Sequence, residues 1–172
     1  MVLLRVPFVW EQVVDGYGGR QMRPRGRRVM VFRTPDGKGV KGEIFENEIG
    51  ERIFFSWRNS TEHKFRKWKA WGIDVKIIDK IYSMFNEAEK PSGFVIFDED
   101  EKIYYRVDRK TFMALSTIYH PPDNAPNCDG PQYMLPLNRW ERTTLLSAQV
   151  ADELKKKKEK ESKKIATLEE YY

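Results

Sequence analysis

The chemistry most strongly indicated by this sequence is the binding of phosphate groups by arginine. Between Gly16 and Pro35 the chain contains several arginines and no acidic residue. They are Arg20, Arg23, Arg25, Arg27, Arg28 and Arg33. Guanidinium groups bind phosphate oxygens, and several of them on one stretch can follow a nucleic-acid backbone. The glycines and the proline of this stretch predict an exposed arginine-rich loop over residues 15–27.

A second basic stretch interleaves cations with aromatic rings. Its members are Trp57, Arg58, His63, Lys64, Phe65, Arg66, Lys67, Trp68, Lys69 and Trp71. Cations that hold phosphates beside rings that stack on bases are typical of single-strand binding. In a helix Phe65 and Trp68 share one face, so we expect them in the core, and Trp57 and Trp71 are the predicted stacking rings. His63 is a candidate phosphate ligand or general base, and a surface histidine without a role is the simpler interpretation.

Acidic residues offer a lesser alternative, a metal-dependent nuclease. Asp98, Asp100 and Glu101 lie with Lys102 on a predicted hairpin tip, and Glu43 and Glu46 lie on an earlier strand. Carboxylates that meet a lysine can hold Mg²⁺ and orient water, but a hairpin tip is also a common place for solvated acids. The single cysteine, Cys128, excludes an intramolecular disulfide and a multi-cysteine zinc site. No nucleotide-binding glycine loop is present. The sequence therefore predicts no catalytic residue, metal or cofactor.

The first third of the chain has the pattern of an antiparallel sheet. Apolar runs predict strands over residues 2–14, 28–33, 40–46 and 51–57. The sequence Thr-Pro-Asp-Gly at 34–37 predicts a turn, and Asn-Glu-Ile-Gly at 47–50 predicts a hairpin connection. About four strands are expected.

The middle of the chain changes to helical periodicity. A capping-box pattern that begins at Asn59 predicts a helix to about Trp71, and Asp74 begins a second helix through Phe85. A helix-turn-helix is a minor alternative here. A second hairpin with an acidic turn at 98–101 follows, and then a third helix extends from Asp108 to Tyr119. Residues 120–136 are expected to form a long loop.

We predict an α+β fold with an N-terminal antiparallel sheet, paired helices, a second hairpin, a third helix and a charged C-terminal helix. The last helix would start at Thr143 or Thr144 and continue into the run of Lys and Glu after residue 154. The predicted organisation is one α+β domain over residues 1–154 and a charged helical extension or tail over residues 155–172.

Composition bounds the class of protein and its partners. Charged residues make up 33% of the chain and hydrophobic residues 40%, and the net charge is +5. The abundance of Lys, Arg and Glu is typical of heat-adapted proteins. No signal peptide or membrane-length apolar run is found, so we expect a cytoplasmic protein. The expected function is non-enzymatic DNA or RNA binding, with single strands slightly favoured. The alternative is a structural or protein-interaction subunit that binds a partner through the acidic hairpin 98–101 or the C-terminal tail.

Overall fold

The computed structural model describes residues 10–14, 20–58, 69–121, 130–144 and 160. The chain divides into two compact units, and each is described here by itself. One unit is Gly26–Arg142, and the other combines Met1–Arg25 with Thr143–Tyr172. In the latter, β1 (Trp10–Val14) and β2 (Arg20–Pro24) pair as antiparallel strands. The predicted domain boundary at residue 154 and the predicted charged extension lie outside the described residues, apart from Lys160.

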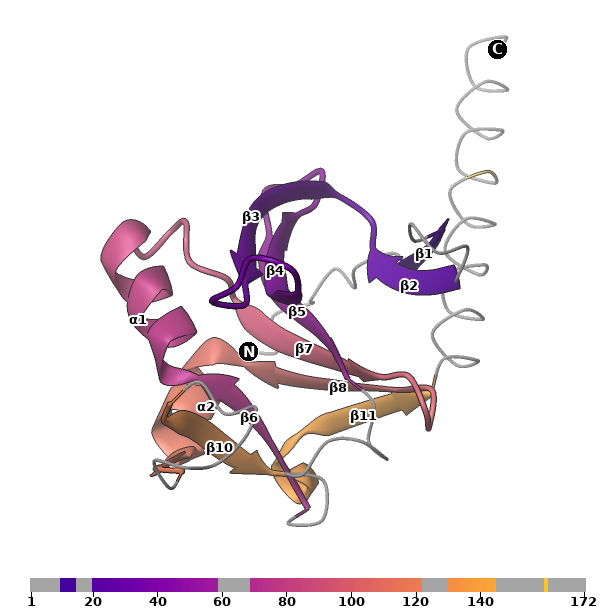
Figure 1. The fold of residues 1–172 in the computed structure, drawn as a ribbon. Coiled ribbons are helices and arrows are strands. Elements are labelled where there is room, and N and C mark those ends of the chain that lie inside the picture. The colour runs from indigo at the N-terminus through magenta and orange to yellow at the C-terminus, as the bar shows by residue number, and fades with distance from the viewer. Residues whose placement is uncertain (1–9, 15–19, 59–68, 122–129, 145–159, 161–172) are drawn as a thin grey trace, which may run out of the picture. The chain divides into compact units, whose positions relative to one another are not determined.

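The main sheet of the unit Gly26–Arg142 is six-stranded and mixed, with the order β11-β8-β7-β5-β4-β3 (Figure 1). Its strands are β3 (Arg27–Arg33), β4 (Val40–Glu46), β5 (Arg52–Arg58), β7 (Gly93–Asp98), β8 (Ile103–Asp108) and β11 (Glu141–Thr144). β5 and β7 run parallel, whereas β3 with β4, β4 with β5, and β7 with β8 are antiparallel. Because a parallel pair needs a crossover, the chain between β5 and β7 returns through β6 and α1.

A smaller antiparallel sheet and two short helices complete this unit. The sheet has the order β6-β10-β9, with β6 (Ala70–Asp74), β10 (Gln132–Pro136) and β9 (Thr117–Tyr119). The helices are α1 (Val75–Met84) and α2 (Arg109–Leu115), and a 3-10 turn spans Leu137–Arg139. Figure 1 shows β6 running directly into α1. No helix in the described part of the chain is long and apolar enough to cross a membrane.

One apolar cluster joins the two sheets and both helices. From the main sheet it takes Phe32, Ile44, Phe54, Phe94, Ile96, Tyr105 and Val107, and from the other elements Trp71, Ile73, Ile77, Ile78, Ile81, Phe112, Leu135, Leu137 and Trp140. We call the side of the main sheet that packs into this cluster the core face. The opposite face is also apolar, with buried Phe45, Phe55, Val95, Phe97 and Tyr104. Strands that are apolar on both faces take central positions in a sheet, as β5 and β7 do.

The predicted α+β fold with paired helices is wrong. The described residues are mostly strand and contain two α-helices, α1 and α2. Trp71 and Gly72, the predicted end of the first helix, lie on β6, because they pair with Leu135 and Met134 of β10. This pairing also excludes the helix-turn-helix. α1 confirms the predicted helix after Asp74. The third helix begins as predicted but ends at Leu115, after which Thr117–Tyr119 form β9.

Two predicted loops contain strands instead. Residues 20–24 of the predicted arginine loop form β2, and residues 132–136 of the predicted long loop form β10. Thr143 and Thr144, the predicted start of the last helix, lie on β11. The predicted turns were more accurate: the Gly37 amide donates to the Thr34 carbonyl oxygen at 2.8 Å, and the Gly50 amide to that of Asn47 at 3.1 Å. The acidic turn between β7 and β8 is also confirmed.

Candidate nucleic-acid interface

The arginines of the first stretch lie on strands and a bend. Arg20 and Arg23 are on β2, Arg25 lies in the bend after it, and the others are on β3. β3 is the last strand in the order of the main sheet. Arg25, Arg27, Arg28 and Arg33 are exposed, and Arg23 is partly buried. The basic side chains of β3 therefore line one edge of the sheet.

A β-bulge on β3 determines which way these side chains point. Arg28 pairs with Phe45, but Met30 pairs with the adjacent residue Ile44, so Val29 is an extra residue. Val29 and Met30 both pack against the core cluster, as the two bulge residues often do. Arg27 consequently lies on the core side of the edge, and Arg28 and Arg33 lie on the side of the opposite face.

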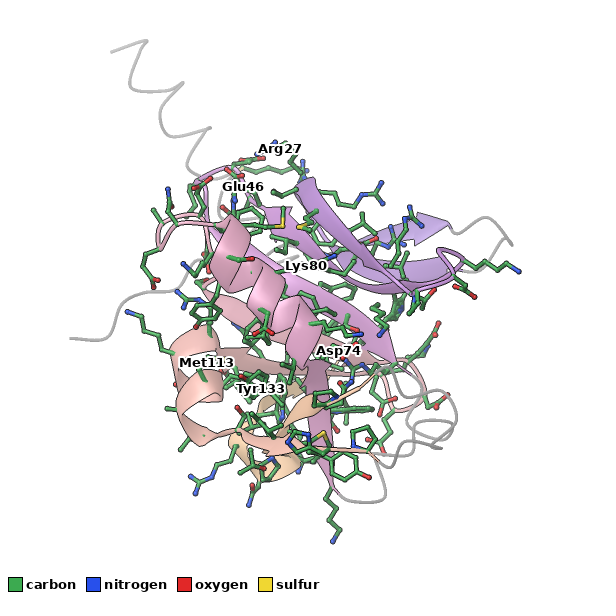
Figure 2. The ribbon with its side chains drawn as sticks, turned by 60° about the vertical axis from the view of Figure 1, so that its left-hand side comes forward. Arg27, Glu46, Asp74, Lys80, Met113 and Tyr133 are labelled. Atoms are coloured by element: carbon green, nitrogen blue, oxygen red, sulfur yellow. The ribbon has the colours of Figure 1, made fainter. Side chains whose placement is uncertain are left out.

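Two of the β3 arginines form ion pairs. Arg27 Nη2 donates to Glu46 Oε2 at 2.8 Å, and Figure 2 shows the two side chains close together. Arg27, followed by Arg52, holds the pKa of Glu46 below its ordinary value. Arg28 Nη1 lies 3.5 Å from Glu43 Oε1. The arginine side chains remain 70% and 52% exposed. The Arg27 pair is largely exposed and therefore weak, whereas Arg28 pairs with a buried carboxylate. Both guanidinium groups are still exposed to solvent and hence accessible to another anion.

Arg33 and Lys38 are different, because they are exposed and form no ion pair with any residue that the structure describes. Arg33 ends β3, and Lys38 follows in the turn to β4. Asp36 lies between them, and its carboxylate accepts from the Thr34 hydroxyl and the Lys38 amide. These two hydrogen bonds lower the pKa of Asp36. Lys38 is not among the predicted site residues, although its place directly after a turn sequence is a usable signal.

The second basic stretch does not form one surface. Trp57 and Arg58 end β5, Lys69 is an exposed turn residue, and Trp71 lies on β6. His63, Lys64, Phe65, Arg66, Lys67 and Trp68 lie outside the described residues. Trp71 has 0% exposure and packs edge-on against Tyr105, with ring centroids 6.0 Å apart. The prediction that it stacks on a base is therefore wrong.

Trp57 remains the one predicted stacking ring that the structure describes as accessible. It is partly buried, and its ring centroid lies 6.0 Å from that of Phe55, on the opposite face. Arg28 and Arg33 point to this same face. β5 lies two strands from β3, a separation of about 10 Å.

Arg58 points to the core face and belongs to a polar cluster around Asp74. The Asp74 carboxylate accepts hydrogen bonds from Lys41 Nζ and, at 2.9 Å, from Gln132 Nε2. Figure 2 shows Asp74 at the first turn of α1. Lys41 reaches it because of a second bulge: Phe32 pairs with Gly42 but Arg33 pairs with Val40, which leaves Lys41 as the extra residue. Burial lowers the pKa of Arg58 to about 10, and the Asp74 charge opposes this shift.

The carboxylates of the nuclease alternative are not brought together. Glu43 is buried on the opposite face beside Arg28, whereas Asp98 pairs in register with Arg58 on the core face. The sheet separates these two groups, and Asp100 lies in the turn beyond β7. Within the described residues no group of three or more His, Cys, Asp or Glu side chains has the geometry of a metal site. Only Asp100 and Glu101 of the acidic turn are fully exposed.

Comparisons with known proteins do not assign the chain to a family. The sequence matches no family model, and neither a curated protein nor a solved structure is significantly similar to it.

Proposed function

We propose that this chain binds nucleic acid through the exposed cations of β3 and the turn after it. We call this set of Arg27, Arg28, Arg33 and Lys38 the β3 surface. The observation that carries the proposal is the exposure of Arg33 and Lys38 without a carboxylate partner in the described part of the chain. Unpaired cations on a sheet edge can bind phosphates without first breaking an internal ion pair.

Arg27 and Arg28 extend the β3 surface along the strand. Residues 28 and 33 are about 17 Å apart at the usual strand rise, which allows contact with more than one phosphate. Their ion pairs with Glu46 and Glu43 tie the guanidinium groups to the sheet without burying them. At Arg27 a phosphate competes with a weak, largely exposed pair, whereas at Arg28 it competes with a buried carboxylate.

A competing explanation for the same charges is protection of the sheet edge. Charged side chains on an edge strand discourage pairing with strands of other molecules. The bulge at Val29 has the same effect. Edge protection predicts no affinity for polyanions beyond a general charge effect, so the two explanations differ in a measurable way.

The preference for single strands depends on Trp57, since Trp71 is buried. Trp57 lies on the same side of the sheet as Arg28 and Arg33. A base that stacks on it would belong to a strand whose phosphates follow β3. No catalytic role is proposed for any residue of this surface.

The test is an R33Q/K38Q double variant in a fluorescence-anisotropy titration with labelled single-stranded DNA, duplex DNA and RNA at several salt concentrations. The slope of log affinity against log salt is expected to fall by about 1 to 2, because each lost phosphate contact removes about 0.7 to 0.9. Affinity at low salt is expected to fall for all three ligands.

The matched control is a K76Q/K80Q variant on α1. It makes the same change in net charge with two exposed lysines on another element, and Lys80 is labelled in Figure 2. If both double variants weaken binding equally, the β3 surface is not a specific phosphate site. If the unaltered protein binds none of the ligands at low salt, the proposed function fails.

A further inference from the structure

Arg58 and Asp98 end the two strands that run parallel in the main sheet. Arg58 is the last residue of β5, Asp98 is the last residue of β7, and the two pair in register. α1 starts directly after Asp74, whose charge acts on Arg58. In sheets with parallel strands, ligands usually bind beyond the carboxyl ends of the strands, where the crossover helix begins.

The hydrogen bonds of Arg58 are incomplete. Within the described residues its side chain makes one hydrogen bond, from Nε to Ser56 Oγ at 3.5 Å, a long distance, and neither Nη atom has an acceptor there. It forms no ion pair with Asp98, its register neighbour, or with Asp74. A guanidinium group has five donors in a planar fork, and a partly buried one normally uses several of them.

The surroundings fix the position of the Arg58 side chain. Its Cζ atom lies 5.8 Å from the ring centroid of the buried Trp71. Ser56 is fixed in turn, because its hydroxyl donates to the Lys41 carbonyl oxygen at 2.8 Å. The guanidinium group is therefore held in place while its terminal donors stay unused.

The charge of Arg58 is also poorly balanced. Asp74 is the nearest acid that acts on it, but the Asp74 carboxylate already accepts from Lys41 and Gln132. Burial outweighs the attraction to Asp74, which is why the pKa falls to about 10. The Nη donors of Arg58 reach solvent and are therefore accessible to a ligand, and groups with a shifted pKa are concentrated at binding sites.

We propose that Arg58 is a binding site for a single phosphate group at the carboxyl ends of β5 and β7. The two Nη donors contact phosphate oxygens, and the start of α1 favours negative charge nearby. This site shares no residue with the β3 surface, so it can be right or wrong independently of the proposed function.

The experiment follows thermal unfolding of the full chain in inorganic phosphate and in chloride at equal ionic strength. Since a ligand that binds only the folded state raises the unfolding temperature, phosphate is expected to raise it and chloride is not. In R58Q the phosphate affinity derived from this shift is expected to fall at least about tenfold. R58K keeps the positive charge but lacks the planar guanidinium donors, so we expect a phosphate affinity between those of R58Q and the unaltered protein.

R139Q is the matched control, because Arg139 is an exposed arginine on the 3-10 turn that belongs neither to the β3 surface nor to this site. An equal effect of phosphate on R58Q, R58K and the unaltered protein would overturn the proposal, as would no effect beyond chloride on the unaltered protein. If R58Q does not fold, the comparison with R58K decides the question.

A second series of unfolding measurements identifies the kind of molecule that carries the phosphate group. A nucleoside monophosphate and short oligonucleotides with and without a terminal phosphate are compared in the unaltered protein and in R58K. An Arg58-dependent effect of all three ligands supports a backbone phosphate, and an effect limited to terminal phosphates supports a nucleotide or strand end. An effect that does not depend on Arg58 in either case contradicts the site.

Discussion

At the scale of single residues, Arg109 shows what a guanidinium group does in this protein when each of its three nitrogens donates a hydrogen bond. It is buried, and its Nε donates to the Pro91 carbonyl oxygen at 2.9 Å. Nη1 donates to the Tyr82 hydroxyl at 2.9 Å, and Nη2 to Glu87 at 2.6 Å. One side chain thus joins α2 to α1 and to the chain before β7. This bonding contrasts with that of Arg58 and supports a structural role for Arg109.

Replacing Arg109 with lysine is expected to lower the free energy of unfolding by about 2 kcal/mol. Lysine keeps the charge but cannot reach three acceptors in different directions, so the buried Pro91 carbonyl or the Tyr82 and Glu87 acceptors lose their partner. Urea unfolding followed by circular dichroism measures the change.

Lys110→Gln is the control for Arg109→Lys, because Lys110 is the exposed next residue of α2. It is expected to have little effect, as surface substitutions usually do. A similar loss in both variants would mean that the Arg109 hydrogen bonds contribute no more to stability than an exposed side chain of α2.

The site residues differ in how far sequence alone could predict them. The exposure of Arg27, Arg28 and Arg33 follows from a basic run beside a turn sequence, and the structure places all three at the surface. The burial of Trp71 does not follow, because it depends on pairing with β10, more than 60 residues later in the chain. Lys41 was missed for a similar reason: a bulge turns it towards Asp74, and no local pattern marks that bulge.

At the scale of elements, the helices and strands that were predicted correctly are those with a clear pattern in their own residues. α1 has buried Ile77, Ile78 and Ile81 at helical spacing, and β5 and β7 are continuous apolar runs. β2, β6, β9 and β10 were missed, since each is only three to five residues long and exists through pairing with a partner strand. Such strands carry too little local pattern to override glycine, proline or an adjacent helical stretch.

β4 shows a strand position that depends on close packing. A Cβ atom on Gly42 would clash with the ring of Phe54. That ring cannot move away, because it is fully buried between Phe32 and Phe94, with centroids at 5.9 and 5.8 Å. The absence of a side chain at Gly42 therefore allows the rings of Phe32, Phe54 and Phe94 to pack together on the core face.

Gly42→Ala is expected to destabilise the protein by about 1 to 3 kcal/mol, the usual cost of overpacking a core. Thermal or urea unfolding measures the loss. Val40→Ala on the same strand is the control, since Val40 is 44% exposed and its truncation leaves the core intact. If Gly42→Ala is no more destabilising than Val40→Ala, the Phe54 ring has room to shift and the close approach is unimportant.

At the scale of the whole molecule, basic and acidic segments of the sequence are interleaved in space. Arg27 and Arg52 both bind Glu46, Arg106 lies 3.5 Å from Glu51, and the acidic turn starts beside Arg58. The charges of the described residues therefore form a patchwork in which the β3 surface is a local excess. Net charge alone would not have located it.

This patchwork makes stability sensitive to acid. The pKa of Glu46 is lowered by Arg27 and Arg52, that of Glu87 by Arg109, and that of Asp36 by Thr34 and Lys38. A carboxylate whose pKa is lower in the folded state stabilises the protein above its unfolded pKa. That stability is lost as the pH falls through the folded pKa. We expect a free energy of unfolding that is nearly constant near neutral pH and falls below the ordinary carboxylate range of about 4.

An E46Q/E87Q variant separates these ion pairs from the general effect of acid. Both replacements keep a hydrogen-bond acceptor but remove the titrating charge, so the acid loss of stability is expected to become shallower than in the unaltered protein. Added salt is expected to reduce the same part of the loss, because these pairs are exposed and screened. The Asp36 contribution rests on hydrogen bonds within one turn and is expected to persist in salt. Urea unfolding across a pH series, with and without added salt, measures the effect of the variant, the effect of salt and the remaining Asp36 contribution. If the free energy of unfolding depends on acid in the same way in the variant and in the unaltered protein, the Arg27 and Arg109 ion pairs do not couple to folding.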